Sequence, residues 1–402
     1  MITAKPILEE VAGAASFEYG NYNSQRAEGM FNLPIGDSVA VRVAGLYLVR
    51  DGFAETIDPR ANFKDLDNRD IYSLRGSLRW EPTTNTTVDL VASYFEEDDN
   101  RSRASKGLCD FDATAVLGCT PTGLGFDSAN FSATLGGLAM SDIVLGPFGA
   151  FPFNTIQNNP NPPDFRKAYV DERSKYYADE TFYMAAIEHD FGSFSLNANI
   201  ARQETEVRST GFGGSPIGGS NVAPSPLVRA LLPQTSAVLF NGNQIGVSGI
   251  DPNETGWIGG NILRFADGIF SYDQSDLLAE QTSFEVRLSS DFDGPWNGTV
   301  GYYSLDYQNE ADYYVFSNSL DYNSAVLPTL LFGNPAAGVV LDGLALGAPY
   351  FHSDTDLFEL ESSGLFGEAY WTPTEDFTLT LGLRSTTDEK FLRDRTPPLL
   401  AL

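Results

Sequence analysis

The sequence predicts an all-β fold in which antiparallel, up-and-down strands form the wall of a transmembrane β-barrel. Three observations predict it: strand-like runs recur along the chain, the best-defined runs have one apolar and one charged face, and tight turns alternate with long connections. Because side chains along a strand point alternately to its two faces, such runs fit a sheet with one apolar surface.

About eleven runs have the composition of strands, and most are about ten residues or longer, whereas soluble strands are usually about 5–6 residues long. They lie near residues 10–20, 22–33, 38–50, 70–81, 86–98, 178–190, 193–208, 280–291, 297–311, 357–371 and 376–389. The 38 Gly, 28 Phe and 18 Tyr residues favour turns and strands over helices. The sequence contains no stretch of about 18 apolar residues, so no transmembrane helix is predicted.

Five pairs of neighbouring runs meet at tight turns rich in Pro, Gly, Asn or Asp. These turns are Pro34–Asp37, Glu81–Asn85, His189–Ser193, Asp291–Asn297 and Thr372–Phe377. The connections between the pairs are long, covering 51–68, 99–177, 209–279 and 312–356. Alternate connections of a meander lie at the same end, so the tight turns are expected at one end and the long loops at the other, as in outer-membrane barrels with long extracellular loops.

The hairpin Arg69–Asn100 assigns the two faces. The face expected to contact lipid contains Tyr72, Leu74, Leu78 and Trp80 in its first strand and Val88, Leu90 and Tyr94 in its second, and a later run adds Leu379, Leu381 and Leu383. The opposite face, expected to line a polar lumen, contains Arg75, Arg79, Asp89 and Arg384. From Tyr72 to Trp80 is roughly 26 Å along a strand, or roughly 20 Å of height at a tilt of about 40°, near the thickness of a barrel's apolar band.

Three of the four tryptophans, Trp80, Trp296 and Trp371, lie in or beside tight turns. This placement favours an aromatic girdle at the membrane interface over aromatic residues that cap a soluble core. An odd number of strands cannot close a bacterial single-chain barrel, and an open edge in lipid is very costly, so the chain is expected to be a piece of a larger barrel.

The formal net charge of −29 argues against a nucleic-acid partner, whose phosphates attract Lys and Arg. The charge fits either plain solubility, the simpler explanation, or the handling of cations. The acidic segment Glu96–Asn100 is interpreted as a solvated rim, with a divalent-cation site shared with lipopolysaccharide as the less favoured alternative.

The two cysteines, Cys109 and Cys119, are ten residues apart and favour a disulfide over free thiols. The only histidines are His189, at a tight turn, and His352, in a long connection. Neither lies near a nucleophile motif, so no catalytic residue, cofactor or metal site is assigned and the protein is not expected to be an enzyme. The first residues, MITAKPILEEV, show no signal peptide.

Taken together, residues 17–53, 69–100 and 364–390 resemble the barrel of TonB-dependent outer-membrane receptors, in the branch of iron-complex receptors. In that family a plug domain fills a barrel of about 22 strands. The resemblance implies that residues 1–9, with ITAKP, are the tail of a plug domain and its linker, and that 10–402 are the N-terminal half of a barrel, without the plug itself.

The resemblance also implies a place in the outer membrane of a Gram-negative cell, in contact with lipid and lipopolysaccharide. It implies uptake of a scarce ligand, most often a ferric siderophore or similar iron complex, driven by TonB through an N-terminal region that this chain lacks. No motif identifies the residues that bind the ligand. Two alternatives stay open: a passive outer-membrane porin, and a soluble secreted β-rich binding protein whose apolar faces pack inward.

Overall fold

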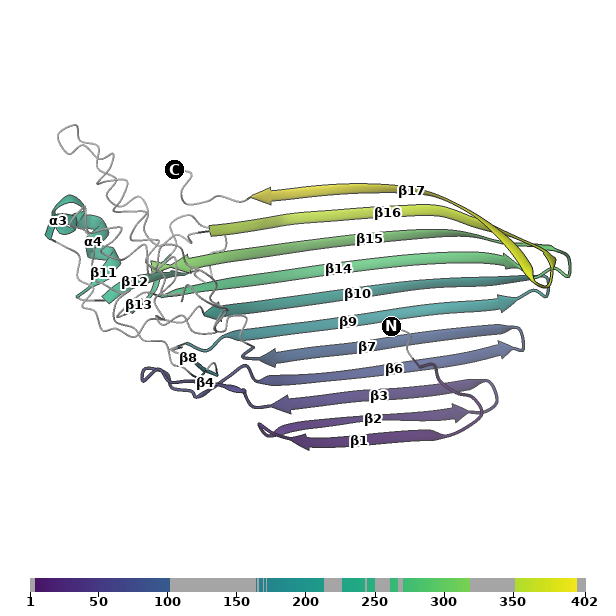
Figure 1. Cartoon of the computed structure of the whole chain (residues 1–402), viewed down its shortest axis with the longest axis horizontal. Coiled ribbons are helices and arrows are strands. Elements are labelled where there is room, and N and C mark those ends of the chain that lie inside the picture. Colours follow the sequence, from purple (N-terminus) through teal and green to yellow (C-terminus); the bar gives the residue numbers. More distant parts are fainter. Residues whose placement is uncertain are drawn as a thin grey trace.

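A computed structural model describes residues 4–101, 164, 166–168, 170, 172–212, 226–242, 244–249, 261–266, 270–318 and 351–395. In these residues eleven long strands form one curved antiparallel sheet (Figure 1). Each long strand pairs with the long strand that follows it in the chain. The strands are β1 (Ala12–Gly20), β2 (Ser24–Ile35), β3 (Val39–Arg50), β6 (Arg69–Thr83), β7 (Thr86–Asp99), β9 (Lys175–Asp190), β10 (Phe194–Phe212), β14 (Ser271–Ser290), β15 (Trp296–Ser317), β16 (Phe351–Thr374) and β17 (Phe377–Arg395). The predicted all-β, up-and-down architecture is confirmed, and all eleven predicted runs are strands.

The two ends of the sheet differ as predicted. The five tight turns lie together at one end, and the long connections leave from the other (Figure 1). Gly36 and Gly192 have φ values of 70° and 90° in two of the turns, a conformation that glycine adopts without steric cost.

Strands near the long connections extend further than the sequence pattern predicts. β10 continues to Phe212, β14 begins at Ser271, β15 continues to Ser317 and β16 begins at Phe351. These extensions are mixed in polarity, so they lack the apolar alternation that marks a strand in sequence. Backbone ladder pairs nevertheless continue through them, as between Tyr272 and Phe316.

Short strands and helices also lie in the long connections. β4 (Ala54–Thr56), β5 (Asp65–Leu66) and β8 (Lys167–Ala168) form one small sheet. The helices α3 (Pro226–Leu231) and α4 (Pro233–Leu239) precede a second sheet of β11 (Phe240–Asn241), β12 (Gln244–Gly249) and β13 (Asn261–Ala266). Within the described ranges, no helix is long and apolar enough to cross a bilayer.

The register of the main sheet is staggered, as in a tilted barrel wall. A row of directly paired residues runs from Trp80 in β6, through β7, β9, β10 and β14, to Tyr302 in β15. Tyr302 lies six residues past Trp296, which begins β15 beside its own turn. Trp80 lies three residues before the end of β6 at Thr83. If the turns lie at one height, the row moves three residues, about 10 Å, along the strands over about 24 Å of sheet, an inclination of about 20–25°.

Candidate functional site

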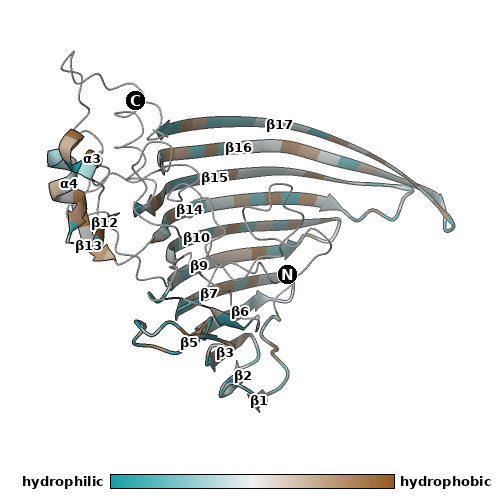
Figure 2. Cartoon of the chain, turned by 60° about the vertical axis from the view of Figure 1, so that its left-hand side comes forward, coloured by the Kyte–Doolittle hydropathy of each residue, from teal (hydrophilic) through white to brown (hydrophobic). Residues whose placement is uncertain are grey.

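The sheet has an outward face with an apolar band next to the tight turns. Among the predicted lipid-facing residues, seven are exposed: Tyr72, Leu74, Trp80, Leu90, Leu379, Leu381 and Leu383. Leu78, Val88 and Tyr94 are half-buried. Figure 2 shows the hydrophobic and hydrophilic residues alternating along the strands. All ten share the outward face, and their contact with lipid stays a prediction.

Aromatic side chains lie along the turn end of this face. The rings of Trp296 and Trp371 stack across β15 and β16, with centroids 5.7 Å apart. The ring of Trp371 also lies edge-on to the ring of Phe377, with centroids 6.3 Å apart. Trp296 is 59% exposed and Trp80 is 45% exposed. An apolar band bordered by exposed aromatic rings is typical of a membrane-facing barrel wall.

The opposite, inner face is polar, and it contains a charged group built on the first predicted hairpin. Arg79 and Asp89 are directly paired in β6 and β7. The guanidinium donates from Nε to Oδ1 and from Nη2 to Oδ2, both at 2.9 Å, and Asp89 is only 7% exposed. Lys5 Nζ lies 3.0 Å from Asp89 Oδ2. Two cations therefore share one buried carboxylate, and the bidentate geometry fixes the orientation of the arginine.

The N-terminal segment is attached to the same inner face through Asn32, which is completely buried. Asn32 Oδ1 accepts a hydrogen bond from Ile7 N at 2.9 Å, and its Nδ2 donates to the carbonyl oxygens of Ile7 and Glu10 at 2.8 and 2.9 Å. Asn32 and Asp89 both lie near tight turns of their strands, so these contacts hold the segment across the turn end of the inner face. The sequence pattern gives no signal for them, because they join residues 22 to 84 positions apart.

The acidic segment Glu96–Asn100 at the outer end of β7 is a solvated rim only in part, because Asp98 is exposed and Glu96 is half-buried but the other three residues are covered. Glu97, Asp99 and Asn100 are 4–7% exposed. Arg101 contacts the carboxylate of Glu97, and its guanidinium lies 4.2 Å from the Tyr176 ring centroid. Burial lowers the pKa of Arg101, but the Glu97 carboxylate raises it, and the net direction is upward. Arg101 therefore offsets the charge of Glu97, and its backbone N–H donates to Asp99 Oδ1 at 2.8 Å; the sequence pattern gives no signal for either contact.

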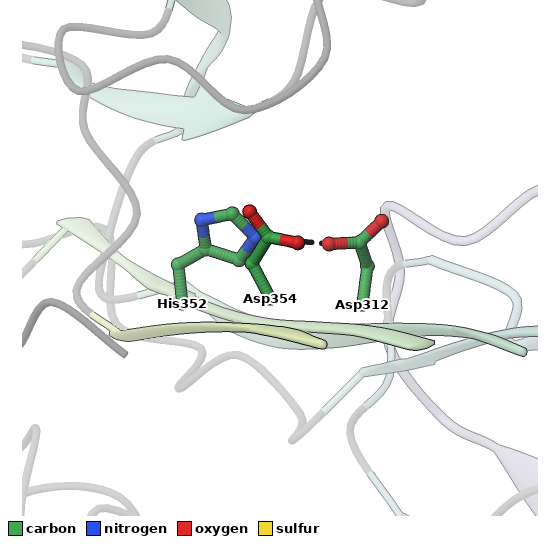
Figure 3. Close-up of side chains that lie close together, drawn as sticks. All are labelled: Asp312, His352 and Asp354. Atoms are coloured by element: carbon green, nitrogen blue, oxygen red, sulfur yellow. Dashed lines mark hydrogen bonds and ion pairs between the residues drawn. The ribbon is translucent and has the colours of Figure 1, made fainter. Parts of the chain in front are cut away.

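The remaining predicted residues are placed as follows. Arg75 is half-buried on the inner face of β6. Arg384 lies on the inner face of the edge strand β17, where its Nε donates to Thr386 Oγ1 at 2.9 Å. Cys109 and Cys119 lie outside the described residues, so their disulfide stays a prediction. His352, expected in a loop, is the second residue of β16 and lies beside Asp312 and Asp354 (Figure 3).

An apolar outward face, a charged inner face and a staggered register define the wall of a membrane-type β-barrel. No family model and no curated protein matches the sequence. Among solved structures, the ferric yersiniabactin uptake receptor FyuA of Yersinia pestis matches 98% of this chain and 44% of its own, with a TM-score of 0.52 at 12% identity. The outer-membrane ferripyoverdine receptor of Pseudomonas aeruginosa matches 98% and 39%, with a TM-score of 0.53 at 13% identity.

The chain therefore has the fold of siderophore-receptor barrels, and the resemblance to TonB-dependent receptors is confirmed at the level of the fold. It spans less than half the length of these two receptors. The described sheet is open, with β1 and β17 as its edges.

Proposed function

We propose that this chain is part of an outer-membrane receptor for the TonB-dependent uptake of a scarce ligand, a ferric siderophore or a similar iron complex. The observation that carries the proposal is the two-faced, staggered wall of eleven strands, which follows the fold of two siderophore receptors along 98% of the chain. A wall of this kind turns its apolar band to lipid and encloses a polar passage.

Residues 1–9 are, in this proposal, the tail of a plug domain and its linker, and residues 10–402 are the N-terminal half of the barrel. The contacts of Lys5 with Asp89 and of Ile7 with Asn32 support it, because they hold the start of the chain on the inner face. A plug must be joined to its barrel on that side of the wall.

The proposed location is the outer membrane of a Gram-negative cell. Lipid and lipopolysaccharide are the partners of the outward face. TonB acts on a plug segment outside this chain, and the ligand binds among the outer loops and at the top of the plug. Displacement of the plug then opens the polar passage between the loops and the tight turns.

A transport assay tests the proposal. A strain that lacks the whole receptor is supplied with radioactive iron bound to each of a panel of siderophores, and the intact receptor is restored in strains with and without TonB. The proposal predicts that at least one complex enters only when both receptor and TonB are present. Iron uptake that is the same with and without the receptor across the panel would contradict the iron-complex assignment.

Two further measurements separate the alternatives. The intact receptor should conduct almost no ions in planar bilayers, because the plug fills the lumen, whereas a passive porin would conduct steadily. It should also require detergent to remain monodisperse. A protein that stays monodisperse in plain buffer would favour the soluble secreted alternative.

A further inference from the structure

A histidine and two aspartates meet on β15 and β16 beside the long connection between these strands (Figure 3). His352 Nε2 lies 3.1 Å from Asp312 Oδ1. One donor atom from each of Asp312, His352 and Asp354 lies within 4.8 Å of the other two. The register explains the meeting, because Asp312 pairs directly with Asp354, and Tyr314 pairs with His352.

The group lies on the outward face, away from the inner-face contacts of the N-terminal segment. β14 and β15 pair without a register shift from Thr299 to Ser317, so the even-numbered residues of β15 share one face. Asp312 therefore shares the face of Val300 and Tyr302, which are 55% and 38% exposed in the apolar band. The proposed ligand passage lies on the other side of the wall.

Directly paired like charges destabilise a sheet, and here Asp312 has an aspartate on both sides: Asp276 in β14 and Asp354 in β16. The one basic side chain in the three-residue group is His352, which is 7% exposed. A cation placed between the carboxylates would relieve their repulsion, because each offers an oxygen to it.

The imidazole is held in a fixed orientation. Its ring stacks on Tyr314 with a centroid distance of 4.1 Å and an interplanar angle of 13°, and Tyr314 is itself only 4% exposed. The side chain of Asp312 is 39% exposed, so an ion can reach the group from solvent. A preoriented nitrogen donor beside an accessible carboxylate is what a metal site requires, and a lone acidic patch lacks it.

We propose that Asp312, His352 and Asp354 bind a divalent transition-metal ion of the zinc class. One imidazole nitrogen and two carboxylate oxygens suit Zn²⁺ better than Ca²⁺ or Mg²⁺, which take oxygen donors. Donors of a tetrahedral Zn²⁺ site lie about 3.4 Å apart at bond lengths of about 2.1 Å, so the 3.1 Å pair is close to its final spacing and Asp354 needs only a small movement. Water completes the coordination.

The bound ion links β15 to β16 just beyond an irregularity in their register, which shifts between Asn309 and Ala311. A cross-strand metal contact there holds the two strands together where the long connection leaves β15 at Ser317 and returns at Phe351. This inference does not depend on which ligand the receptor transports.

The test uses the intact receptor, purified in detergent and stripped with a chelator. Zn²⁺ alone is titrated by calorimetry into the native protein and into the variants His352→Gln and Asp354→Asn. The matched control is Asp356→Asn, which makes the same change two residues away at a side chain that pairs with Arg393. Retention of the heat-modifiable barrel band on gels checks that each variant is folded.

The proposal predicts one Zn²⁺ site per receptor, weakened about tenfold or more in both ligand variants and unchanged in the control. It also predicts that Ca²⁺ does not compete at equal concentration. Unchanged Zn²⁺ affinity in a folded His352→Gln variant would overturn it, as would equal weakening in all three variants or effective competition by Ca²⁺, since each would indicate a general acidic surface.

Discussion

Gly76 offers a sharp test of the direction in which the apolar face points. It lies in the middle of the outward face of β6, four residues from Tyr72 and four from Trp80, and a Cβ added there meets no heavy atom within 4 Å. Four residues correspond to about 13 Å along the strand, or about 10 Å of height at a tilt of about 40°, the general value for membrane barrels. An arginine at this position is therefore near the bilayer midplane, with either interface beyond easy reach of its side chain.

The expected cost of Gly76→Arg is about 2–4 kcal/mol, the range for a cation at the midplane of a barrel wall. Replacing a strand glycine recovers about 0.5–1 kcal/mol, so the net loss is about 1–3.5 kcal/mol. Gly76→Leu is the matched variant: it also adds a long side chain, but an apolar one, and should be neutral or stabilising. The assay is urea unfolding of the intact receptor in lipid vesicles, followed by tryptophan fluorescence.

The relative stability of the two variants tests whether this face meets lipid or water. If this face met water, arginine would be tolerated and leucine would gain nothing from the change. Equal midpoints for the two variants, or a more stable arginine variant, would refute the assignment of lipid to this face.

Three further perturbations test separate contacts. Asp89→Asn leaves the paired Arg79 without its carboxylate and should cost about 3 kcal/mol in urea unfolding, whereas a change below about 0.5 kcal/mol would show that the pair is solvated. A double-mutant cycle on Trp296→Ala and Trp371→Ala should give a coupling energy of about 0.5–1.5 kcal/mol, and strict additivity would deny the stacking. Asn32→Ala removes three hydrogen bonds to the N-terminal segment and should expose that segment to limited proteolysis at least several-fold faster than in the native receptor; an unchanged rate would show that other contacts hold it.

The sequence was most informative where strands cross the apolar band. The alternation in β6 and β7 predicts both faces of the hairpin, because lipid on one side and a polar interior on the other impose opposite chemistry on successive residues. Beyond the band both faces meet polar surroundings, and the pattern disappears. This explains why the first nine residues of β14, from Ser271 to Ala279, were expected to be a loop.

The candidate sites were harder to predict, because register brings distant residues together. Asp312 and His352 are 40 positions apart, and Lys5 is 84 positions from Asp89, so neither contact leaves a motif. The charged end of β7 shows the same limit. Its acids suggest a solvated rim in the sequence, and only the fold reveals that Glu97 is covered and paired with Arg101.

The most direct test of the central claim is the accessibility of a nitroxide label scanned along β6. Single cysteines are placed at each position from 71 to 80 of the intact receptor, with Cys109 and Cys119 replaced by serine, and the protein is reconstituted in lipid. Collision with oxygen, which concentrates in the bilayer, should be high at even positions such as Leu74, and collision with a water-soluble nickel complex should be high at odd positions such as Arg75. The same alternation with the two reagents exchanged, or no alternation, would contradict an apolar face turned to lipid.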